Sequence, residues 1–502
     1  MRTDLIKARI RTNLATGTLK MLANKSFLRS AALKVVTDRV KKSLRDYEMT
    51  EGSQSEYLAA VEAQYVINLI NLGIRNLDRG YISKDYLKRV AETLGRGIWG
   101  ESSRSREAAQ KYREKYGINP PSLCVISPTQ RCNLNCIGCY AASNARTQAS
   151  LPYDMVARLV REVRDICGMT FIVISGGEPF MWKDGDKGLL TLAEEFNDMF
   201  FHVYTNGTLL DESTCQKMIK LGNITPAISV EGYEAETDRR RGKGVFQKIL
   251  RSMDNLKKYG IGFGVSVTAT KENLPILLED RFYEYWFEEV GATYMWMFHL
   301  MPIGRARDTM DLVISPEDRM KLLAQWEEML FKRGYFIGDF WNSGAASRGC
   351  IAYGRPSGYF YVDWNGNITP CAFVPYYVDN LYDLYKQGKT IDEALWSDFF
   401  KRGRQWQMEY GYLSNPPGNF FAPCSIRDNY KYFREKVLTP DAKPEDENAR
   451  LALEDPQYYE KMVKFGEEIH QLTESWWKEK LVQNSQPDQP AKEAQHLNSS
   501  SN

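Results

Sequence analysis

Short apolar runs alternate with longer amphipathic stretches from about residue 121, and no other feature of the sequence limits the possible folds as strongly. The runs have the length of strands, whereas stretches such as Tyr153–Arg164 and Phe246–Tyr259 repeat their apolar positions with a helical period. Six βα units of this kind predict an α/β fold, in which a parallel sheet curls into a partial (β/α)6 barrel of the TIM type. The six predicted strands are Leu123–Ser127, Phe171–Ser175, Phe201–Tyr204, Ala227–Val230, Phe263–Thr268 and Tyr294–His299.

The barrel is expected to occupy residues 113–335, with further segments on both sides. Residues 1–112 have the apolar spacing of helices, which predicts a helical N-terminal region. Residues 336–436 are rich in Gly, aromatic residues and turns, and we expect them to form a small second module. Within it, the pair Asn365-Gly366 between two apolar runs predicts a β-hairpin.

The C-terminal part of the chain divides into two segments. Residues 437–482 are expected to be helical, and residues 483–502 form a Gln/Ser/Asn/Pro tail whose composition predicts disorder. One amphipathic helix is indicated by apolar residues at heptad-like spacing, namely Met462, Phe465, Ile469, Leu472 and Trp476.

Basic residues are concentrated at the N-terminus. The whole chain has a formal net charge of only +2, which gives no reason to expect a nucleic acid as partner. Residues 1–46, however, hold twelve Lys or Arg against three Asp, and their apolar residues recur at helical spacing. This pattern predicts a basic amphipathic arm that either packs on the body of the protein or contacts an anionic membrane surface or acidic partner. The apolar positions are Leu33, Val36, Val40 and Leu44.

Nine cysteines without an apolar N-terminal signal segment do not resemble a secreted disulfide framework. The sequence contains no run of eighteen uncharged apolar residues, which is about the length needed to span a bilayer. We therefore expect a cytoplasmic protein that contacts a membrane, if at all, from its surface.

The densest chemical signal follows the first predicted strand, where Cys132, Cys136 and Cys139 lie within eight residues and Tyr140 comes next. Three thiolates at this spacing can hold three irons of a cubane cluster and leave the fourth iron open to a ligand. The alternative is a structural zinc site, which needs a fourth nearby Cys or His. Only four histidines occur in the chain, so the cluster is the stronger interpretation.

Polar motifs follow the next three predicted strands. Ser175-Gly176-Gly177-Glu178-Pro179 comes after the second strand, Tyr204-Thr205-Asn206-Gly207 after the third and Ser229-Val230-Glu231-Gly232 after the fourth. Because the carboxyl ends of barrel strands meet at one face, these side chains are expected near the cysteines. Each motif taken alone could equally be an ordinary turn or helix cap.

The CxxxCxxC spacing with its trailing Tyr140, followed by Gly-Gly-Glu-Pro, resembles the radical S-adenosylmethionine (SAM) superfamily, and the resemblance covers residues 121–310. It implies a [4Fe-4S] cluster on Cys132, Cys136 and Cys139 whose open iron is chelated by SAM. It also implies that an electron cleaves SAM to a 5′-deoxyadenosyl radical, which abstracts a hydrogen atom. The cofactors then supply the difficult chemistry and the protein positions them.

The resemblance also assigns roles to the motifs. It implies that Gly176, Gly177, Glu178 and Pro179, beside Tyr140, hold the methionyl amine of SAM. Ser229 and Glu231 are the preferred ribose partners, and Asn206 is a further candidate. One of Arg239 to Arg241 could pair with a carboxylate, and the loop from His299 to Ala306 resembles the segment near the adenine, although His299 could equally be an interior histidine.

A second set of cysteines comprises Cys350, Cys371 and Cys424. Cys350 and the Gly366-x4-Cys371 unit resemble the SPASM/Twitch extension, which binds auxiliary iron–sulfur clusters. The match is incomplete because the usual run of downstream cysteines is reduced to Cys424. These thiolates could hold one auxiliary [4Fe-4S] cluster with an open or non-cysteine fourth ligand, or they could be unliganded. The remaining cysteines, Cys124, Cys167 and Cys215, are interpreted as buried structural thiols.

The resemblance implies hydrogen abstraction from an unactivated carbon, and an auxiliary cluster favours oxidation or C–C or C–S bond formation. The basic arm and the C-terminal helix suggest a lipid or other membrane-surface substrate. The competing substrate class is a peptide or protein, as in SPASM maturases, and a non-enzymatic iron–sulfur redox sensor is the alternative of another class. Asp339, just ahead of Cys350, is a speculative substrate contact. The expected electron donor is ferredoxin or flavodoxin.

Overall fold

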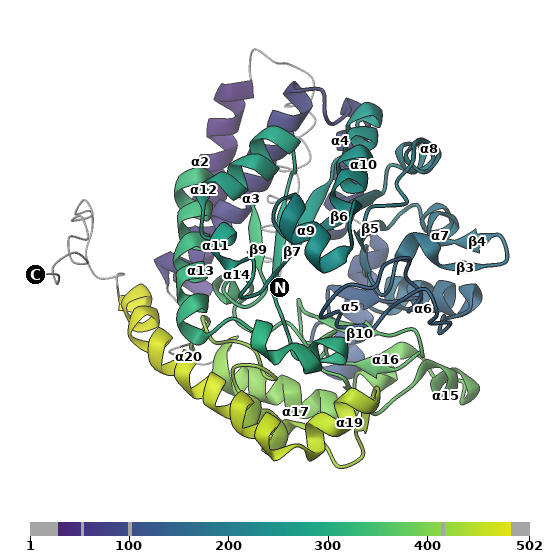
Figure 1. Cartoon of the computed structure of the whole chain (residues 1–502), viewed down its shortest axis with the longest axis vertical. Helices are drawn as coiled ribbons and strands as arrows, with labels where there is room; N and C mark the ends of the chain where they lie inside the picture. Colours follow the sequence, from purple (N-terminus) through teal and green to yellow (C-terminus); the bar gives the residue numbers. More distant parts are fainter. Residues whose placement is uncertain (1–28, 52–54, 99–102, 413–416, 483–502) are drawn as a thin grey trace, which may run out of the picture.

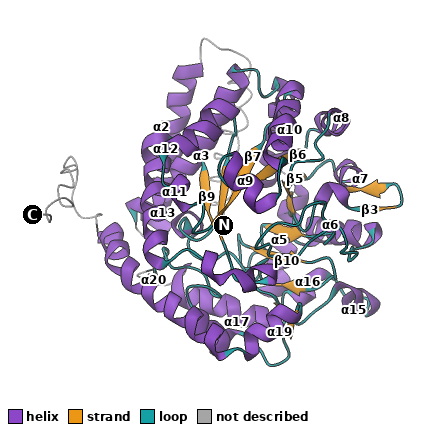
Figure 2. Cartoon of the chain, viewed as in Figure 1, coloured by secondary structure: helices purple, strands orange, loops and turns teal. Residues whose placement is uncertain are grey.

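The structure is a computed structural model that describes residues 29–51, 55–98, 103–412 and 417–482. The predicted disordered tail and the first 28 residues of the basic arm lie outside the described residues. The strands of the large sheet lie in the middle of the molecule and helices surround them, whereas the short pair β3 (Lys183–Asp184) and β4 (Lys187–Gly188) lies at its edge (Figure 1, Figure 2).

A single nine-stranded sheet forms the centre of the molecule, in the order β11-β10-β1-β2-β5-β6-β7-β8-β9. Every neighbouring pair in this order is parallel except β11 with β10. The six predicted strands are present, which confirms the partial barrel. Their bounds are β1 (Leu123–Ile126), β2 (Phe171–Ile174), β5 (Phe200–Thr205), β6 (Ile224–Val230), β7 (Gly264–Ala269) and β8 (Met295–His299).

Helices between the strands bury the outer face of the sheet. In the first of them, Val156, Leu159, Val160 and Val163 follow the helical period and are fully buried, and each contributes about 1.5–3 kcal/mol of burial free energy. The connecting helices are α6 (Tyr153–Ile166), α7 (Leu189–Glu195), α8 (Glu212–Leu221), α9 (Glu234–Arg241), α10 (Val245–Tyr259), α11 (Leu274–Leu277), α12 (Asp280–Glu284) and α13 (Pro316–Glu328).

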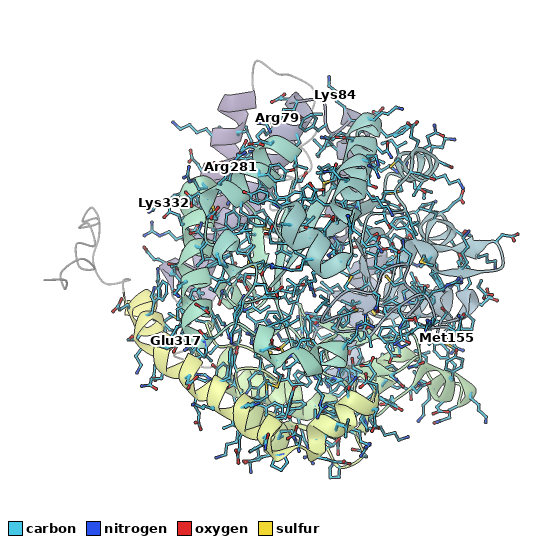
Figure 3. The ribbon with its side chains drawn as sticks, in the orientation of Figure 1. Arg79, Lys84, Met155, Arg281, Glu317 and Lys332 are labelled. Atoms are coloured by element: carbon cyan, nitrogen blue, oxygen red, sulfur yellow. The ribbon has the colours of Figure 1, made fainter. Side chains whose placement is uncertain are left out.

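The N-terminal helices close the barrel at the amino ends of its strands. The Tyr86 hydroxyl donates to the carbonyls of Ile224 and Gly262, where β6 begins and β7 is about to begin, and the Asn76 amide donates to Gly291 ahead of β8. The charged residues Arg79 and Lys84 stand at the connection between two of these helices, at the edge of the molecule (Figure 3). The helices are α2 (Arg29–Glu51), α3 (Glu56–Asp78), α4 (Lys84–Ile98) and α5 (Ser103–Tyr116).

The sheet continues across the sequence boundary expected at residue 336. The strand β9 (Ile337–Asp339) pairs with β8, while β10 (Tyr359–Val362) pairs with β1 at the other edge. The predicted hairpin is confirmed, because β10 pairs antiparallel with β11 (Ile368–Thr369). The hairpin that belongs to the second module in the sequence therefore extends the barrel sheet instead of forming a sheet of its own.

The described residues after β9, which we call the C-terminal segment, wrap one side of the barrel, with α20 (Pro456–Val482) along its outside (Figure 1). The predicted apolar face is rotated in part, since Met462, Ile469 and Trp477 are buried whereas Leu472 is exposed. The other helices of this segment are α14 (Gly344–Ser347), α15 (Leu381–Lys386), α16 (Ile391–Ala394), α17 (Asp398–Gln407), α18 (Tyr430–Tyr432) and α19 (Glu447–Glu454).

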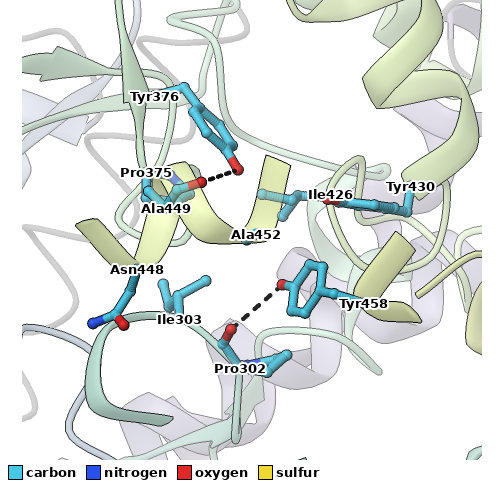
Figure 4. Close-up of a pocket in the computed structure, with 10 residues that line it drawn as sticks. All are labelled: Pro302, Ile303, Pro375, Tyr376, Ile426, Tyr430, Asn448, Ala449, Ala452 and Tyr458. Atoms are coloured by element: carbon cyan, nitrogen blue, oxygen red, sulfur yellow. Dashed lines mark hydrogen bonds between the residues drawn. The ribbon is translucent and has the colours of Figure 1, made fainter. Parts of the chain in front are cut away.

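Helix α19 and α20 also contact the barrel loops. The Tyr458 hydroxyl donates to the carbonyl of Pro302 on the loop after β8, beside a small cavity lined by residues of both helices (Figure 4). The C-terminal helices therefore hold the loop that follows β8 in place.

One described helix, α3, is long and apolar enough to cross a membrane by length and composition alone. Half of its most apolar stretch is buried inside the protein, with Leu58, Val61 and Leu72 in the core. A core helix passes the same test, so this is weak evidence for a membrane span.

Candidate active site

The segment between β1 and α6 carries the first cysteine set at the carboxyl end of the barrel. Cys132 is buried, Cys136 and Cys139 are partly exposed, and the three thiols lie within electrostatic reach of one another. The Cys132 sulfur accepts from the backbone amide of Leu134 at 3.4 Å and from the Asn206 amide at 3.7 Å. Donors of this kind stabilise thiolate ligands, so the surroundings fit an iron–sulfur cluster.

Among the described residues, no three His, Cys, Asp or Glu side chains are grouped closely enough to hold one metal ion. A cubane needs a wider arrangement, because its three thiolates bind three different irons. Cys132, Cys136 and Cys139 lie spread around one loop, which is the wider arrangement that a cubane needs.

The Gly-Gly-Glu-Pro loop packs directly on the cysteine loop. The amides of Gly177 and Glu178 donate to the carbonyls of Thr129 and Arg131, at 2.8 and 2.9 Å. A Cβ at Gly177 would lie 2.2 Å from the Arg131 oxygen, and one at Gly176 would lie 2.6 Å from that of Thr129. The two glycines thus allow the Gly-Gly-Glu-Pro loop to pack closely against the backbone of the cysteine loop. The sequence had suggested that they allow a close approach to a ligand.

Glu178 connects the loop after β2 to the carboxyl end of β5. It is fully buried, and its carboxylate accepts from the Thr205 hydroxyl at 2.7 Å and the Asn206 amide at 2.8 Å, while Phe180 donates a third hydrogen bond. Burial raises the pKa of Glu178 to about 7. A carboxylate offers about four acceptor positions, so a further donor such as an ammonium group can still be accepted.

Helix α9 contributes two arginines. Arg240 and Arg241 both donate to Oε1 of the buried Glu231, and Oε2 of that carboxylate has no hydrogen-bond partner. Arg241 also reaches the Cys136 sulfur at 4.0 Å, and the Arg240 carbonyl accepts from the amide of Ile137. Glu231 is therefore held by arginines beside the cysteine loop, which the sequence left undecided.

Three further predicted residues lie in different elements: Ser229 on β6, Tyr140 in the cysteine loop and Pro179 in the Gly-Gly-Glu-Pro loop. Ser229 is partly exposed on β6, and the hydroxyl of Tyr140 contacts that of Ser175 at 3.0 Å. Pro179 is buried as the first residue of a short 3-10 turn. The loop after β8 closes the group, because the Arg305 amide donates to the Cys139 carbonyl and a Cβ at Gly304 would lie 2.0 Å from the Tyr140 oxygen.

The second cysteine set also comes together in space, although Cys350 and Cys424 are 74 residues apart. Electrostatic coupling links Cys424 to both Cys350 and Cys371. The Cys371 sulfur accepts from the Phe373 amide at 3.4 Å and lies 2.8 Å from the hydroxyl of Tyr359. This donor set fits one iron–sulfur cluster with three protein thiolates.

Asp339, the speculative substrate contact of the sequence analysis, is the last residue of β9, at the carboxyl edge of the sheet. It is fully buried, with Oδ1 accepting from the amides of Trp341 and Asn342 and Oδ2 contacting His299 Nε2 at 3.0 Å. His299 is correspondingly an interior residue. Because its two oxygens are engaged by the following loop and by His299, Asp339 orders the segment ahead of Cys350, and a substrate contact at this residue stays a prediction.

An aromatic surface lines the barrel interior between the two cysteine sets. Tyr204 on β5 and Phe298 on β8 meet across the barrel at 5.6 Å between ring centroids, and Phe298 contacts Phe340 and Phe373. Phe373 then lies 6.1 Å from Tyr140, beside the first cysteine set. All five side chains are partly exposed. We call these five residues the aromatic wall.

Sequence reasoning missed the aromatic wall, the Tyr359 contact to Cys371 and the arginine pair on Glu231. Alternating aromatic residues in β8 were a signal for the first of these. The other two join residues that are distant in sequence or on a helix face, for which no local pattern exists.

The chain is similar in sequence to one protein family and to several known proteins. The radical SAM superfamily matches residues 126–274. An AdoMet-dependent heme synthase from Methanosarcina barkeri is 28% identical over 295 residues, which cover 52% of this chain and 80% of the relative. Mycofactocin maturase MftC from Mycolicibacterium smegmatis is 25% identical over 310 residues, 58% of this chain and 74% of the relative. A solved structure of native anSMEcpe with bound AdoMet covers 72% of this chain and 98% of that chain, with 18% identity and a TM-score of 0.47.

Proposed function

We propose that this chain, a radical SAM enzyme with a SPASM-like extension, removes a hydrogen atom from an unactivated carbon of an apolar substrate. The substrate class that we propose is a lipid or other membrane-surface molecule. The product would be an oxidised carbon or a new C–C or C–S bond. SAM and a [4Fe-4S] cluster are the cofactors of this superfamily, and SPASM-type relatives indicate an auxiliary cluster. When bound, they supply a carbon radical able to take hydrogen from such a carbon.

The protein's own residues bind, orient and shield these groups. We infer that Cys132, Cys136 and Cys139 ligate the SAM-binding cluster, while Glu178 accepts from the SAM amine. Ser229 and Glu231 would contact the ribose, with the Glu231 carboxylate fixed by Arg240 and Arg241. Gly176, Gly177, Pro179 and Asn206 would shape the loops around SAM, and Tyr140 would border the substrate space.

The aromatic wall is the observation that carries the substrate class. Ligand sites are lined mainly by apolar and aromatic side chains, and this wall extends from Tyr140, next to Cys139, to Phe373, two residues after Cys371. A substrate on the wall would lie between the two cysteine sets. We infer that Cys350, Cys371 and Cys424 ligate an auxiliary cluster that takes an electron from the substrate or binds it.

Helix α2 supports a membrane surface as the place of action. Val36 is buried against the body, while five basic residues are exposed, namely Lys34, Arg39, Lys41, Lys42 and Arg45. They outnumber the two exposed carboxylates among the described side chains of the same helix, Asp38 and Asp46, although Arg45 pairs with Glu56. A basic exposed face attracts anionic lipid headgroups by about 1 kcal/mol per residue near the surface. We propose a cytoplasmic enzyme that works at the surface of a membrane.

The reductant that we propose is ferredoxin or flavodoxin. Ile137, between two cysteines of the first set, is 46% exposed, so the cysteine loop reaches the protein surface. A reductant docked there would need to pass an electron over a short distance only.

Deuterium transfer tests the substrate class. Anaerobically reconstituted full-length protein would be incubated with SAM, dithionite and anionic vesicles whose acyl chains are perdeuterated. We expect deuterium in the 5′-deoxyadenosine, and a Cys136→Ala variant should give none because its first cluster is incomplete. If 5′-deoxyadenosine forms with no deuterium, the lipid is not the hydrogen donor but the radical chemistry stands.

A peptide or protein substrate is the second candidate, favoured by the maturase among the relatives. Against it, the described segments ahead of β1 form only the helices α2 to α5, and no strand-rich recognition domain lies there. The heme synthase relative suggests a third apolar class, a flat tetrapyrrole that could stack on the aromatic wall. Deuterium transfer from a deuterated macrocycle or peptide in place of the vesicles would separate these classes.

A further inference from the structure

Arg427 is a buried cation that the proposed chemistry does not yet use. Only 2% of the residue is exposed, and neither Nη1 nor Nη2 has a hydrogen-bond partner among the described residues. Its guanidinium lies over the rings of Trp341 and Phe465, 5.1 and 4.7 Å from their centroids. Burial lowers the pKa of Arg427 to about 10, so it is still a cation at neutral pH.

The nearby carboxylates are already engaged elsewhere. Asp428 pairs with Arg319 and accepts from the amide of Cys424, while Asp339 is bound by His299 and by loop amides. Arg319 adds a second positive charge close by. Asp428 and Asp339 offset part of the charge of Arg427, but its Nη1 and Nη2 atoms stay without a hydrogen-bond partner among the described residues. Buried donors without an acceptor are unfavourable, so an anionic acceptor is expected to face Arg427 in the complete enzyme.

The turn that carries Arg427 also carries a thiol of the second set. The Asp428 and Asn429 amides donate to the Cys424 carbonyl at 3.0 and 3.1 Å, which fixes a tight turn over residues 424–429. On the other side, α20 packs so closely that a Cβ at Gly466 would lie 2.5 Å from the Asp428 oxygen. Arg427 is thus held rigidly, within electrostatic reach of Cys424.

We propose that Arg427 is the electrostatic partner of an anionic auxiliary cluster on Cys350, Cys371 and Cys424, and that it raises the reduction potential of that cluster. The inference rests on the auxiliary cluster of the proposed function. Net charge and nearby donors are among the factors that set iron–sulfur potentials. A fixed cation favours the reduced, more negative state, so Arg427 would make the cluster a better acceptor for the electron that a substrate radical loses when it is oxidised.

The test uses the full chain with Cys132, Cys136 and Cys139 replaced by Ala, so that only the second site can hold a cluster. Midpoint potentials would be measured by EPR-monitored redox titration, with iron content determined in parallel. We expect Arg427→Gln to shift the reduction equilibrium about tenfold toward the oxidised state, which is about 59 mV for one electron. Arg427→Lys, which keeps the charge, should retain most of the wild-type potential.

Arg434→Gln is the matched control. Arg434 also lies over two rings, those of Tyr430 and Tyr459, but donates to the Tyr430 hydroxyl and the Leu453 carbonyl. Its loss should leave the potential unchanged. If Arg427→Gln keeps its full iron content and its potential does not shift, the proposed role of Arg427 is overturned, while the auxiliary cluster itself stands.

Two other outcomes are decisive. If Arg427→Gln loses its iron, Arg427→Lys decides: retained iron and potential support the proposal, and loss in both variants overturns it. If the triple-Ala chain itself binds no iron, both this inference and the auxiliary cluster fail, while the chemistry proposed for the first cysteine set is untouched.

Discussion

Single residues decide how closely the two loops of the first cysteine set approach each other. Gly176 and Gly177 lie against the carbonyls of Thr129 and Arg131, so any side chain there would push the loops apart. Glu178 then ties the same loop to Thr205 and Asn206. The geometry around Cys132 therefore depends on residues that are not themselves ligands.

The change Gly177→Ala tests this dependence. Because the added Cβ would meet backbone and not a flexible side chain, we expect a loss of about 1–3 kcal/mol of stability together with a lowered iron content. Thermal unfolding and iron analysis of the reconstituted protein measure both. Gly73→Ala in α3, where nothing lies within 4 Å, is the control and should be neutral or stabilising. Equal iron in both variants would contradict the packing argument.

Strands β5 and β8 build the floor of the barrel from side chains that meet across it. His202 of β5 contacts the rings of Tyr204, Tyr294 and Trp296, and its Nε2 has no partner among the described residues. Layers of inward side chains of this kind fill TIM-type barrels. The second layer, nearer the cysteines, contains Tyr204 and Phe298 of the aromatic wall.

This floor makes stability depend on pH. Burial lowers the pKa of His202 from its ordinary 6.5 to about 3. Between these values the unfolded chain binds a proton that the folded chain does not, so stability falls as the pH drops from 6.5 toward 3. The slope due to this residue is at most about 1.4 kcal/mol per pH unit. Denaturant unfolding at several pH values should show a shallower loss in His202→Phe than in the wild type, and parallel curves would contradict the assignment.

At the scale of the whole molecule, the barrel and the C-terminal segment are one structure. β10 covers the edge of β1, β9 extends β8, and the Tyr361 hydroxyl donates to that of Ser127 next to the cysteine loop. The second cysteine set is thereby attached to the same sheet as the first. This common sheet fixes the distance that the aromatic wall spans.

Truncation after residue 335 is expected to fail for this reason. The shortened chain would lose β9 and β10, and β1 would become an unpaired, apolar edge, a known cause of aggregation. Soluble yield and circular dichroism would measure the effect against the full chain. A soluble, cooperatively folding fragment that binds about four irons would show instead that the barrel is an independent domain.

The sequence by itself determined the local features: six strands with helices between them, the hairpin at Asn365-Gly366, and the order of the motifs along the barrel. These follow from periodicity, turn chemistry and spacing, which act over a few residues. The expected SAM contacts stay predictions, as do the ligand roles of both cysteine sets.

Only the tertiary structure decided what distant residues do to one another. It buried Asp339 at the end of β9, paired Glu231 with two arginines of α9, joined β10 to β1 and assembled the aromatic wall from five separate segments. The physical reason is that burial and electrostatic pairing depend on which surfaces meet, and residues up to hundreds of positions apart meet only when the sheet closes around its core.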